Sequence, residues 1–108
     1  MNQSSVALAR FPFTNQIDYK IRPAVIVSNE KFNNAHNFFW ACPITTKASL
    51  PEFTVEIQEK EFSGQFKVKS FVRTDAVTSI EKELFLKEIG KVSSKLFEKI
   101  KTEINRNL

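Results

Sequence analysis

Two arginines and an aspartate have the types and spacing for chemistry on a phosphate-bearing substrate. Arg22 stands directly before Pro23 and an apolar run. Its guanidinium stays charged at physiological pH and matches phosphate geometry, although it can also pack its stem on the protein surface. Arg73 and Asp75 are two positions apart, so in an extended segment both side chains project from one face. A carboxylate beside an arginine can act as a base, but an ordinary salt bridge is the interpretation that spacing alone favours.

Further polar residues follow the predicted strands and allow two interpretations each. Thr45 ends an apolar strand and precedes Thr46 and Lys47, and hydroxyls and an ammonium at a strand end can hold a phosphate. A turn whose threonines bond to the local backbone is the better interpretation without other observations. Lys67 and Lys69 either follow a nucleic-acid backbone or solvate a strand.

Length, charge and residue counts limit the class of protein. A chain of 108 residues suits one domain spanning 1–108, and a net charge of +4 favours a nucleic acid or an acidic protein as partner, or simply a soluble basic domain. Cys42 is the only cysteine and His36 the only histidine, which excludes an internal disulfide and the usual zinc or copper sites. We therefore predict a cytoplasmic protein with no metal, no cofactor and no membrane segment.

The apolar patterning predicts short strands followed by one helix. Period-two alternation is clearest around Phe53, Val55 and Ile57, and it predicts core positions for Phe38 and Trp40 while leaving Phe39 open. The predicted strands cover residues 6–11, 24–29, 38–44, 52–58, 66–80 and 87–92, with loops at 13–20 and 30–37 and a helical turn at 81–86.

The C-terminal segment has the pattern of an amphipathic helix. Ser93 or Ser94 can cap its N-terminus, and Leu96, Ile100, Ile104 and Leu108 recur every four residues. That spacing places them in one apolar stripe. Several short strands and a terminal helix predict a mainly β fold, a small antiparallel β-barrel with a C-terminal helix. Side chains fill the interior of so small a barrel, so function is expected on loops and outer faces.

Several short motifs follow one another along the chain: Phe11-Pro12-Phe13-Thr14, Arg22–Ser28, Pro43–Lys47, Val72–Asp75, Ile80–Lys82 and Ile89–Ser93. In this order they resemble the PemK/MazF family of toxin endoribonucleases over residues 6–108. The resemblance implies an SH3-like barrel with a C-terminal helix, which works as a homodimer, cleaves single-stranded RNA (mRNA) without a metal and is silenced by a cognate acidic antitoxin. The chain has Ser4-Ser5 where family members usually have Gly-Asp.

The resemblance also implies roles for particular residues. The family's catalytic arginine falls on Arg22, its catalytic hydroxyl on Thr45, and its Arg-x-Asp pair on Arg73 and Asp75. The 2′-hydroxyl of RNA would attack the adjacent phosphorus, with Asp75 as candidate base and with Arg22 and Thr45 stabilising the charge on the phosphoryl oxygens. Cleavage specificity would lie chiefly in residues 14–21 and 46–51. The residues expected to bind RNA are Thr14, Thr46, Lys47, Lys67 and Lys69.

Two rival functions stay open at this point. The same barrel resembles the gyrase-poisoning CcdB toxins, which bind a protein and cleave nothing. A degenerate barrel that only binds RNA or an antitoxin is the other rival, and Ser4-Ser5 favours it. The combination of Arg22, Thr45 and Asp75 favours the ribonuclease, because a gyrase-binding protein has no use for these three groups.

Overall fold

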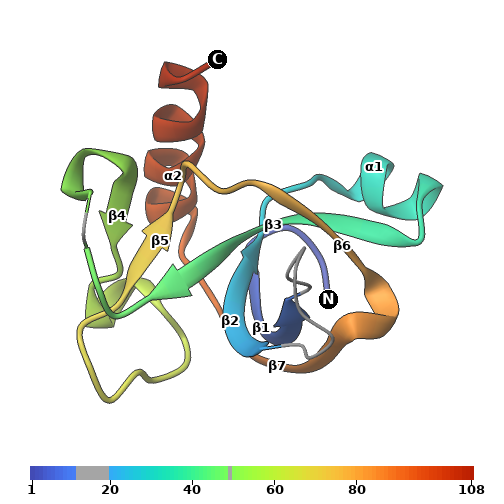
Figure 1. The fold of residues 1–108 in the computed structure, drawn as a ribbon, viewed down its shortest axis with the longest axis horizontal. Helices are drawn as coiled ribbons and strands as arrows, with labels where there is room; N and C mark the ends of the chain where they lie inside the picture. The colour runs from blue at the N-terminus through green and yellow to red at the C-terminus, as the bar shows by residue number, and fades with distance from the viewer. Residues whose placement is uncertain (12–19, 49) are drawn as a thin grey trace.

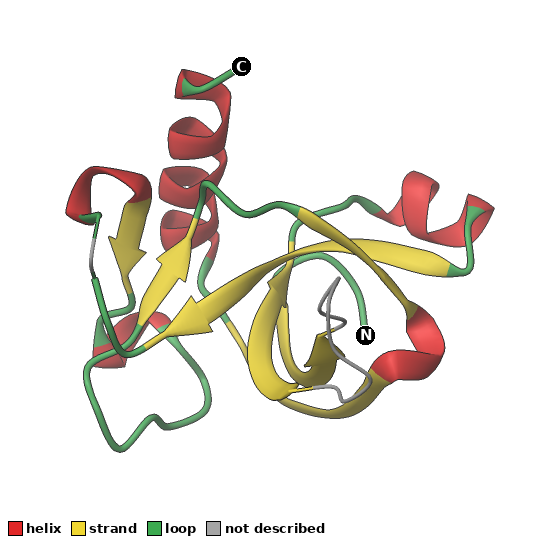
Figure 2. Cartoon of the chain, in the orientation of Figure 1, coloured by secondary structure: helices red, strands yellow, loops and turns green. Residues whose placement is uncertain are grey.

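The computed structural model describes residues 1–11, 20–48 and 50–108 of the chain (Figure 1). Strands dominate, and helix α2 stands at one side of them (Figure 2). The strands are β1 (Ser5–Phe11), β2 (Lys20–Ile26), β3 (Phe38–Thr45), β4 (Thr54–Glu56), β5 (Phe71–Arg73), β6 (Thr78–Glu81) and β7 (Phe85–Lys91). The helices are α1 (Glu30–Ala35) and α2 (Ser94–Arg106), with 3-10 turns η1 (Pro51–Phe53), η2 (Glu59–Glu61) and η3 (Lys82–Leu84).

The strands form one antiparallel sheet in the order β4-β5-β3-β2-β1-β7, with β6 paired to β3 beside this path. Strand β3 pairs with three other strands. Ala41 pairs with Ile26 of β2 and with Thr78 of β6, whereas Ile44 pairs with Val72 of β5. The prediction of a mainly β fold with a C-terminal helix is confirmed. The pairings within the described residues do not close into a ring, so the predicted barrel is not confirmed.

The three central strands bury side chains on both faces. Val6, Val25 and Cys42 point to the face covered by α2, where they pack with Leu96 and Ile100 of that helix. Their neighbours one residue along point the other way and pack with β6 and β7 in a second cluster. That cluster consists of Ala7, Ala9, Phe11, Ala24, Ile26, Phe39, Ala41, Ile80 and Phe85. Because side chains alternate along a strand, a sheet with both faces covered can use every residue of a short strand.

Helix α2 begins at the predicted place, and the structure decides which serine caps it. The Ser93 side chain accepts a hydrogen bond from the backbone N–H of Leu96 at 3.1 Å. Of the predicted stripe, Leu96 and Ile100 are fully buried, whereas Leu108 lies beyond the helix and is 93% exposed. No helix in the described part of the chain is both long enough and apolar enough to cross a membrane.

Three sequence-based expectations about elements are wrong. Residues 30–37 contain α1 rather than a loop, because Asn29 caps a short helix by accepting from the N–H of Phe32 at 2.9 Å. The predicted strand at 52–58 is only Thr54–Glu56, since Pro51 starts a 3-10 turn before it. The predicted strand at 66–80 is the two short strands β5 and β6, separated by a turn.

At the start of β3, the buried face of the strand is the reverse of the one predicted. Phe39 is buried at 5% exposure and packs edge-to-face on Phe85, whereas Trp40 is 44% exposed. The sequence predicted a core position for Trp40. The alternation itself holds, but near its N-terminus β3 turns its Phe39 face to the second cluster.

Candidate active site

An open pocket of about 550 Å³ lies where β2 and β3 separate. It is lined by five cationic side chains and, among the residues the structure describes, by no carboxylate. Polar hydroxyls and one aromatic ring complete its wall. We call it the cationic pocket, and its cations are Lys20, Arg22, Lys47, Lys67 and Arg73.

Strand β2 carries Arg22 into this pocket. Arg22 lies inside the strand, opposite Ala9 of β1, and not just before its first residue as the sequence predicted. The ladder between β2 and β3 begins only at Ala24 and Pro43, so β2 has β1 alone as its ladder partner at Pro23. Proline has no N–H to satisfy, which allows β3 to leave β2 here without an unpaired donor. Residues on both sides of this gap, Pro23 of β2 and Ile44 of β3, line the pocket.

The turn after β3 brings two hydroxyls and an ammonium to the same pocket. Thr45, Thr46 and Lys47 all line it. The backbone N–H of Lys47 donates to Oγ1 of Thr45 at 3.1 Å, which is the local turn bond that the sequence favoured. This bond occupies one lone pair of the hydroxyl and leaves its hydrogen free to donate to a phosphoryl oxygen.

Arg73 and Asp75 form a two-point ion pair at the pocket edge. The Nε of Arg73 donates to Oδ1 of Asp75 at 3.2 Å, and its Nη2 donates to Oδ2 at 3.3 Å. Of the two, only Arg73 lines the cationic pocket. An arginine has five N–H donors, so the pair fixes the guanidinium plane and leaves other donors for a ligand.

The two lysines predicted to bind RNA have different surroundings. Lys67 lines the cationic pocket, whereas Lys69 lies 4.0 Å from the carboxylate of Glu56 and outside that pocket. Both belong to a loop before β5 and not to a strand. Thr14 falls outside the described residues. Within the described chain, no three His, Cys, Asp or Glu side chains gather in a way that could hold a metal ion.

Sequence reasoning missed several lining residues. Lys20 and Phe66 belong to the cationic pocket, together with Ser70. Lys20 was assigned to a loop before the strand, and Ser70 carries no signal in its neighbours. The adjacent Phe66 and Lys67 were the available signal, because an aromatic residue next to a cation is typical of single-strand nucleic-acid sites.

Cys42 is near the site but is not a reactive group. Its side chain is fully buried in the cluster under α2. Burial, and secondly the negative charge of Asp75, raise the pKa of the Cys42 thiol to about 12. A thiol with so high a pKa is neutral at physiological pH and is a poor nucleophile.

Comparisons with known proteins identify the family. The family model described as PemK-like, MazF-like toxin of type II toxin-antitoxin system matches residues 2–108. The chain has no significant sequence match among curated proteins.

Solved structures agree on the fold. A crystal structure of MazF from Deinococcus radiodurans is 16% identical with a TM-score of 0.80, covering 99% of this chain and 94% of that one. A MazE–MazF crystal structure from the same organism is also 16% identical, with a TM-score of 0.79 over the same shares. A mycobacterial endoribonuclease in complex with its cognate antitoxin is 20% identical with a TM-score of 0.78, covering 98% and 92%. With a family match over nearly its whole length, the chain belongs to the PemK-like, MazF-like toxins of type II toxin–antitoxin systems.

Proposed function

We propose that this protein is a metal-independent endoribonuclease that cleaves single-stranded RNA to 2′,3′-cyclic phosphate and 5′-hydroxyl ends. One observation carries the proposal: five cations and two threonine hydroxyls surround one open pocket whose described lining holds no carboxylate. Such a pocket attracts a phosphodiester and repels no part of it.

The pocket residues fit a reaction in which the RNA supplies its own nucleophile. The 2′-hydroxyl attacks the neighbouring phosphorus, the bond from phosphorus to the 5′-oxygen breaks, and a proton passes to that leaving oxygen. Negative charge grows on the phosphoryl oxygens, where Arg22, Arg73 and the Thr45 hydroxyl stabilise it. Two of these donors are in place before the substrate binds, because Thr45 is held by one hydrogen bond and Arg73 by two.

The proposed general base is Asp75, which must take the proton of the 2′-hydroxyl. In the structure its two oxygens accept hydrogen bonds from Arg73, and it lies beside the cationic pocket rather than in its wall. The base role therefore requires an RNA ribose to reach the edge of the pocket at Arg73. The same ion pair gives Asp75 a second task, which is to orient the Arg73 guanidinium.

The proposal includes partners and assembly. Structures of relatives contain MazE with MazF and an endoribonuclease with its cognate antitoxin. We propose that an acidic antitoxin likewise silences this chain and that the active protein is a cytoplasmic homodimer. We also propose an SH3-like barrel, since β6 continues into β7 through η3 and these strands pair with β3 and β1.

Cleavage of single-stranded RNA in the presence of EDTA tests the proposal. We expect discrete fragments with cyclic phosphate ends from the native protein and a rate about 10²- to 10³-fold lower from Arg22→Ala, as for the loss of one charge-stabilising donor. Lys101→Ala, which removes an exposed cation from α2, is the matched control and should cleave normally.

Three results would contradict this function. RNA that stays intact at high protein concentration excludes the nuclease. Co-purification with a topoisomerase subunit and DNA damage without RNA cleavage would select the CcdB-like alternative. Binding of RNA without cleavage would select the degenerate barrel.

A further inference from the structure

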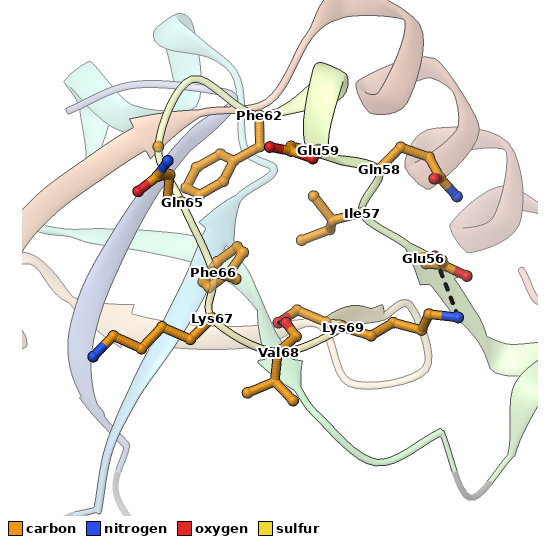
Figure 3. Close-up of a pocket in the computed structure, with 12 residues that line it drawn as sticks. Glu56, Ile57, Gln58, Glu59, Phe62, Gln65, Phe66, Lys67, Val68 and Lys69 are labelled. Carbon is orange, nitrogen blue, oxygen red and sulfur yellow. Dashed lines mark hydrogen bonds and ion pairs between the residues drawn. The ribbon is translucent and has the colours of Figure 1, made fainter.

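A second hollow shares a wall with the cationic pocket. It encloses about 440 Å³ between residues 56–59 and the loop 64–70 (Figure 3). The two hollows therefore adjoin at one loop, so a group in the second hollow lies next to one in the cationic pocket. The residues that line both are Phe66, Lys67, Val68 and Ser70.

The chemistry of the second hollow differs from that of the cationic pocket. Its middle is apolar, with Ile57 and two phenylalanine rings, and Gln65 offers an amide donor and acceptor at its border, whereas the Gln58 side chain caps the turn η2. Glu56 and Glu59 add two carboxylates and Lys67 and Lys69 two ammonium groups, so the charges of the wall balance, and the carboxylates can accept hydrogen bonds from the amino groups of a base. The hollow therefore suits a flat, uncharged group with a hydrogen-bonding edge.

An aromatic pair forms the flat wall of this hollow. The rings of Phe62 and Phe66 are stacked, with centroids 4.7 Å apart and planes 15° apart. Phe62 is buried, whereas Phe66 is partly exposed and lines both hollows. A partly exposed ring supported from behind by a buried one is a platform on which a base can stack.

The only two glycines of the chain keep this platform in position. A Cβ atom at Gly64 would lie 2.7 Å from Cζ of Phe62, and one at Gly90 would lie 2.6 Å from its Cε1. Both distances are too short for any side chain, so Phe62 occupies a slot that glycine alone leaves open. Two hydrogen bonds tie this segment to β7: the backbone N–H of Ser63 donates to the carbonyl of Lys91, and the backbone N–H of Lys91 donates to the Ser63 hydroxyl. The stacking surface is thus preorganised, which lowers the entropy cost of binding.

We propose that the second hollow is a nucleobase subsite, in which the base next to the phosphate of the cationic pocket stacks on Phe66 and is read by Gln65. This inference rests on the proposed RNA cleavage and adds to it a specificity determinant in residues 56–70. The sequence placed specificity chiefly in residues 14–21 and 46–51, because nothing in the pattern showed that the segment 56–70 folds back beside Arg22.

Abasic scanning of a bound RNA tests the subsite. The probe is a 2′-O-methyl heptanucleotide, selected for tight binding from a random pool, which cannot be cleaved because its nucleophilic oxygen is blocked. Each base in turn is replaced by an abasic site, and Kd is measured by fluorescence anisotropy for the native protein and for Phe66→Leu. Phe97→Leu is the matched control, because Phe97 packs against the same core cluster but lies outside both hollows.

The expected result is a coupling between one base and Phe66. Removing that base should weaken binding to the native protein by about 5- to 150-fold, the range for one base stacked on an aromatic ring. The same abasic site should have little further effect on Phe66→Leu and its full effect on Phe97→Leu. Gln65→Ala, at an exposed position, should weaken discrimination among the four bases at the same place and serves if Phe66→Leu unfolds.

The remaining outcomes distinguish failure of the subsite from failure of the proposed RNA cleavage. Equal abasic penalties in the native protein and in both Phe66→Leu and Gln65→Ala would overturn the subsite while leaving RNA cleavage intact. Position-specific coupling together with uncleaved natural RNA would keep the subsite and overturn the nuclease. No binding of the heptanucleotide by the native protein would overturn both.

Discussion

At the scale of single residues, the ion pair between Arg73 and Asp75 joins two roles that substitutions can separate. If Asp75 is the base, Asp75→Asn should lower the cleavage rate by about 10²- to 10⁴-fold, because an amide cannot take the proton of the 2′-hydroxyl. Arg73→Ala should lower the rate by about 10²- to 10³-fold through the loss of one charge-stabilising donor. The measurement is kcat/KM with a single-site RNA.

The control for this pair is Glu98→Gln, which neutralises an exposed carboxylate on α2 and should leave the rate unchanged. A different result would change the assignment. If Asp75→Asn loses less than about tenfold in rate, Asp75 only orients Arg73 and another group is the base.

Cys42 makes stability depend on pH in alkaline solution. Its pKa is raised to about 12 in the folded chain from a reference value of 9.0, first by burial and then by the charge of Asp75. Between these values the folded state keeps a proton that the unfolded state loses, so stability present below pH 9 falls as pH rises. The fall amounts to about 1 kcal/mol between pH 8 and pH 10.

Urea unfolding of the native protein and of Cys42→Ala at pH 8 and pH 10 measures this contribution. The substitution lowers stability at both pH values by leaving a cavity, but it should remove about 1 kcal/mol from the difference between them. Equal differences in the two proteins would show that Cys42 does not contribute to this pH dependence.

Ser4 shows what the departure from the family's Gly-Asp means for the backbone. Its φ is 78°, in the left-handed region that glycine adopts at little cost. The following Ser5 is buried, and its hydroxyl accepts from the N–H of Asn2 at 3.1 Å. The entry to β1 therefore keeps a turn of the kind that glycine favours, and Ser5 fills a local structural role.

At the scale of elements, the capping of α2 gives a prediction with a matched control. Ser93 accepts from the N–H of Leu96, whereas Ser94 is the exposed first residue of the helix. Ser93→Ala should lower the free energy of unfolding by about 0.5–2 kcal/mol, and Ser94→Ala should change it by less than about 0.5 kcal/mol. Thermal or urea denaturation measures both, and equal effects would show that the Ser93 side chain does not cap the helix.

The sequence predicted those elements whose signal is local. The apolar spacing of Leu96 and Ile100 and a capping serine were enough for α2, because a helix over 13 residues repeats its pattern several times. Helix α1 has only six residues, too few for a repeat, and its buried Asn33 bonds to Ser28 and not to an apolar partner. No periodicity could have revealed it.

Positions that depend on the tertiary arrangement were harder to predict. Alternation along β3 separates Phe39 from Trp40, but it cannot say which face is covered at each end of the strand. The same limit applies to the site. Spacing put Arg22 and Thr45 at strand ends and Arg73 beside Asp75, and only the separation of β2 from β3 shows that the two arginines and the threonine face one pocket.

At the scale of the whole molecule, net charge and charge placement make different predictions for RNA binding. The chain carries +4, and five of its cations line the cationic pocket. If all five contact phosphates, log Kd should change with log salt with a slope of about 3.5, since each neutralised phosphate of a single strand contributes about 0.7. Anisotropy with an uncleavable 2′-O-methyl oligonucleotide between low and moderate salt measures this slope.

Two lysine substitutions show whether RNA binding depends on the net charge of the chain or on the cations of the pocket. Lys47→Ala and Lys101→Ala each remove one positive charge, so they lower the net charge equally, but only Lys47 lines the pocket. We expect Lys47→Ala to reduce the slope by about 0.7 and Lys101→Ala to leave it unchanged. Equal reductions would mean that RNA responds to the charge of the whole surface, in which case the grouping of cations beside Arg22 would not be the determinant of binding.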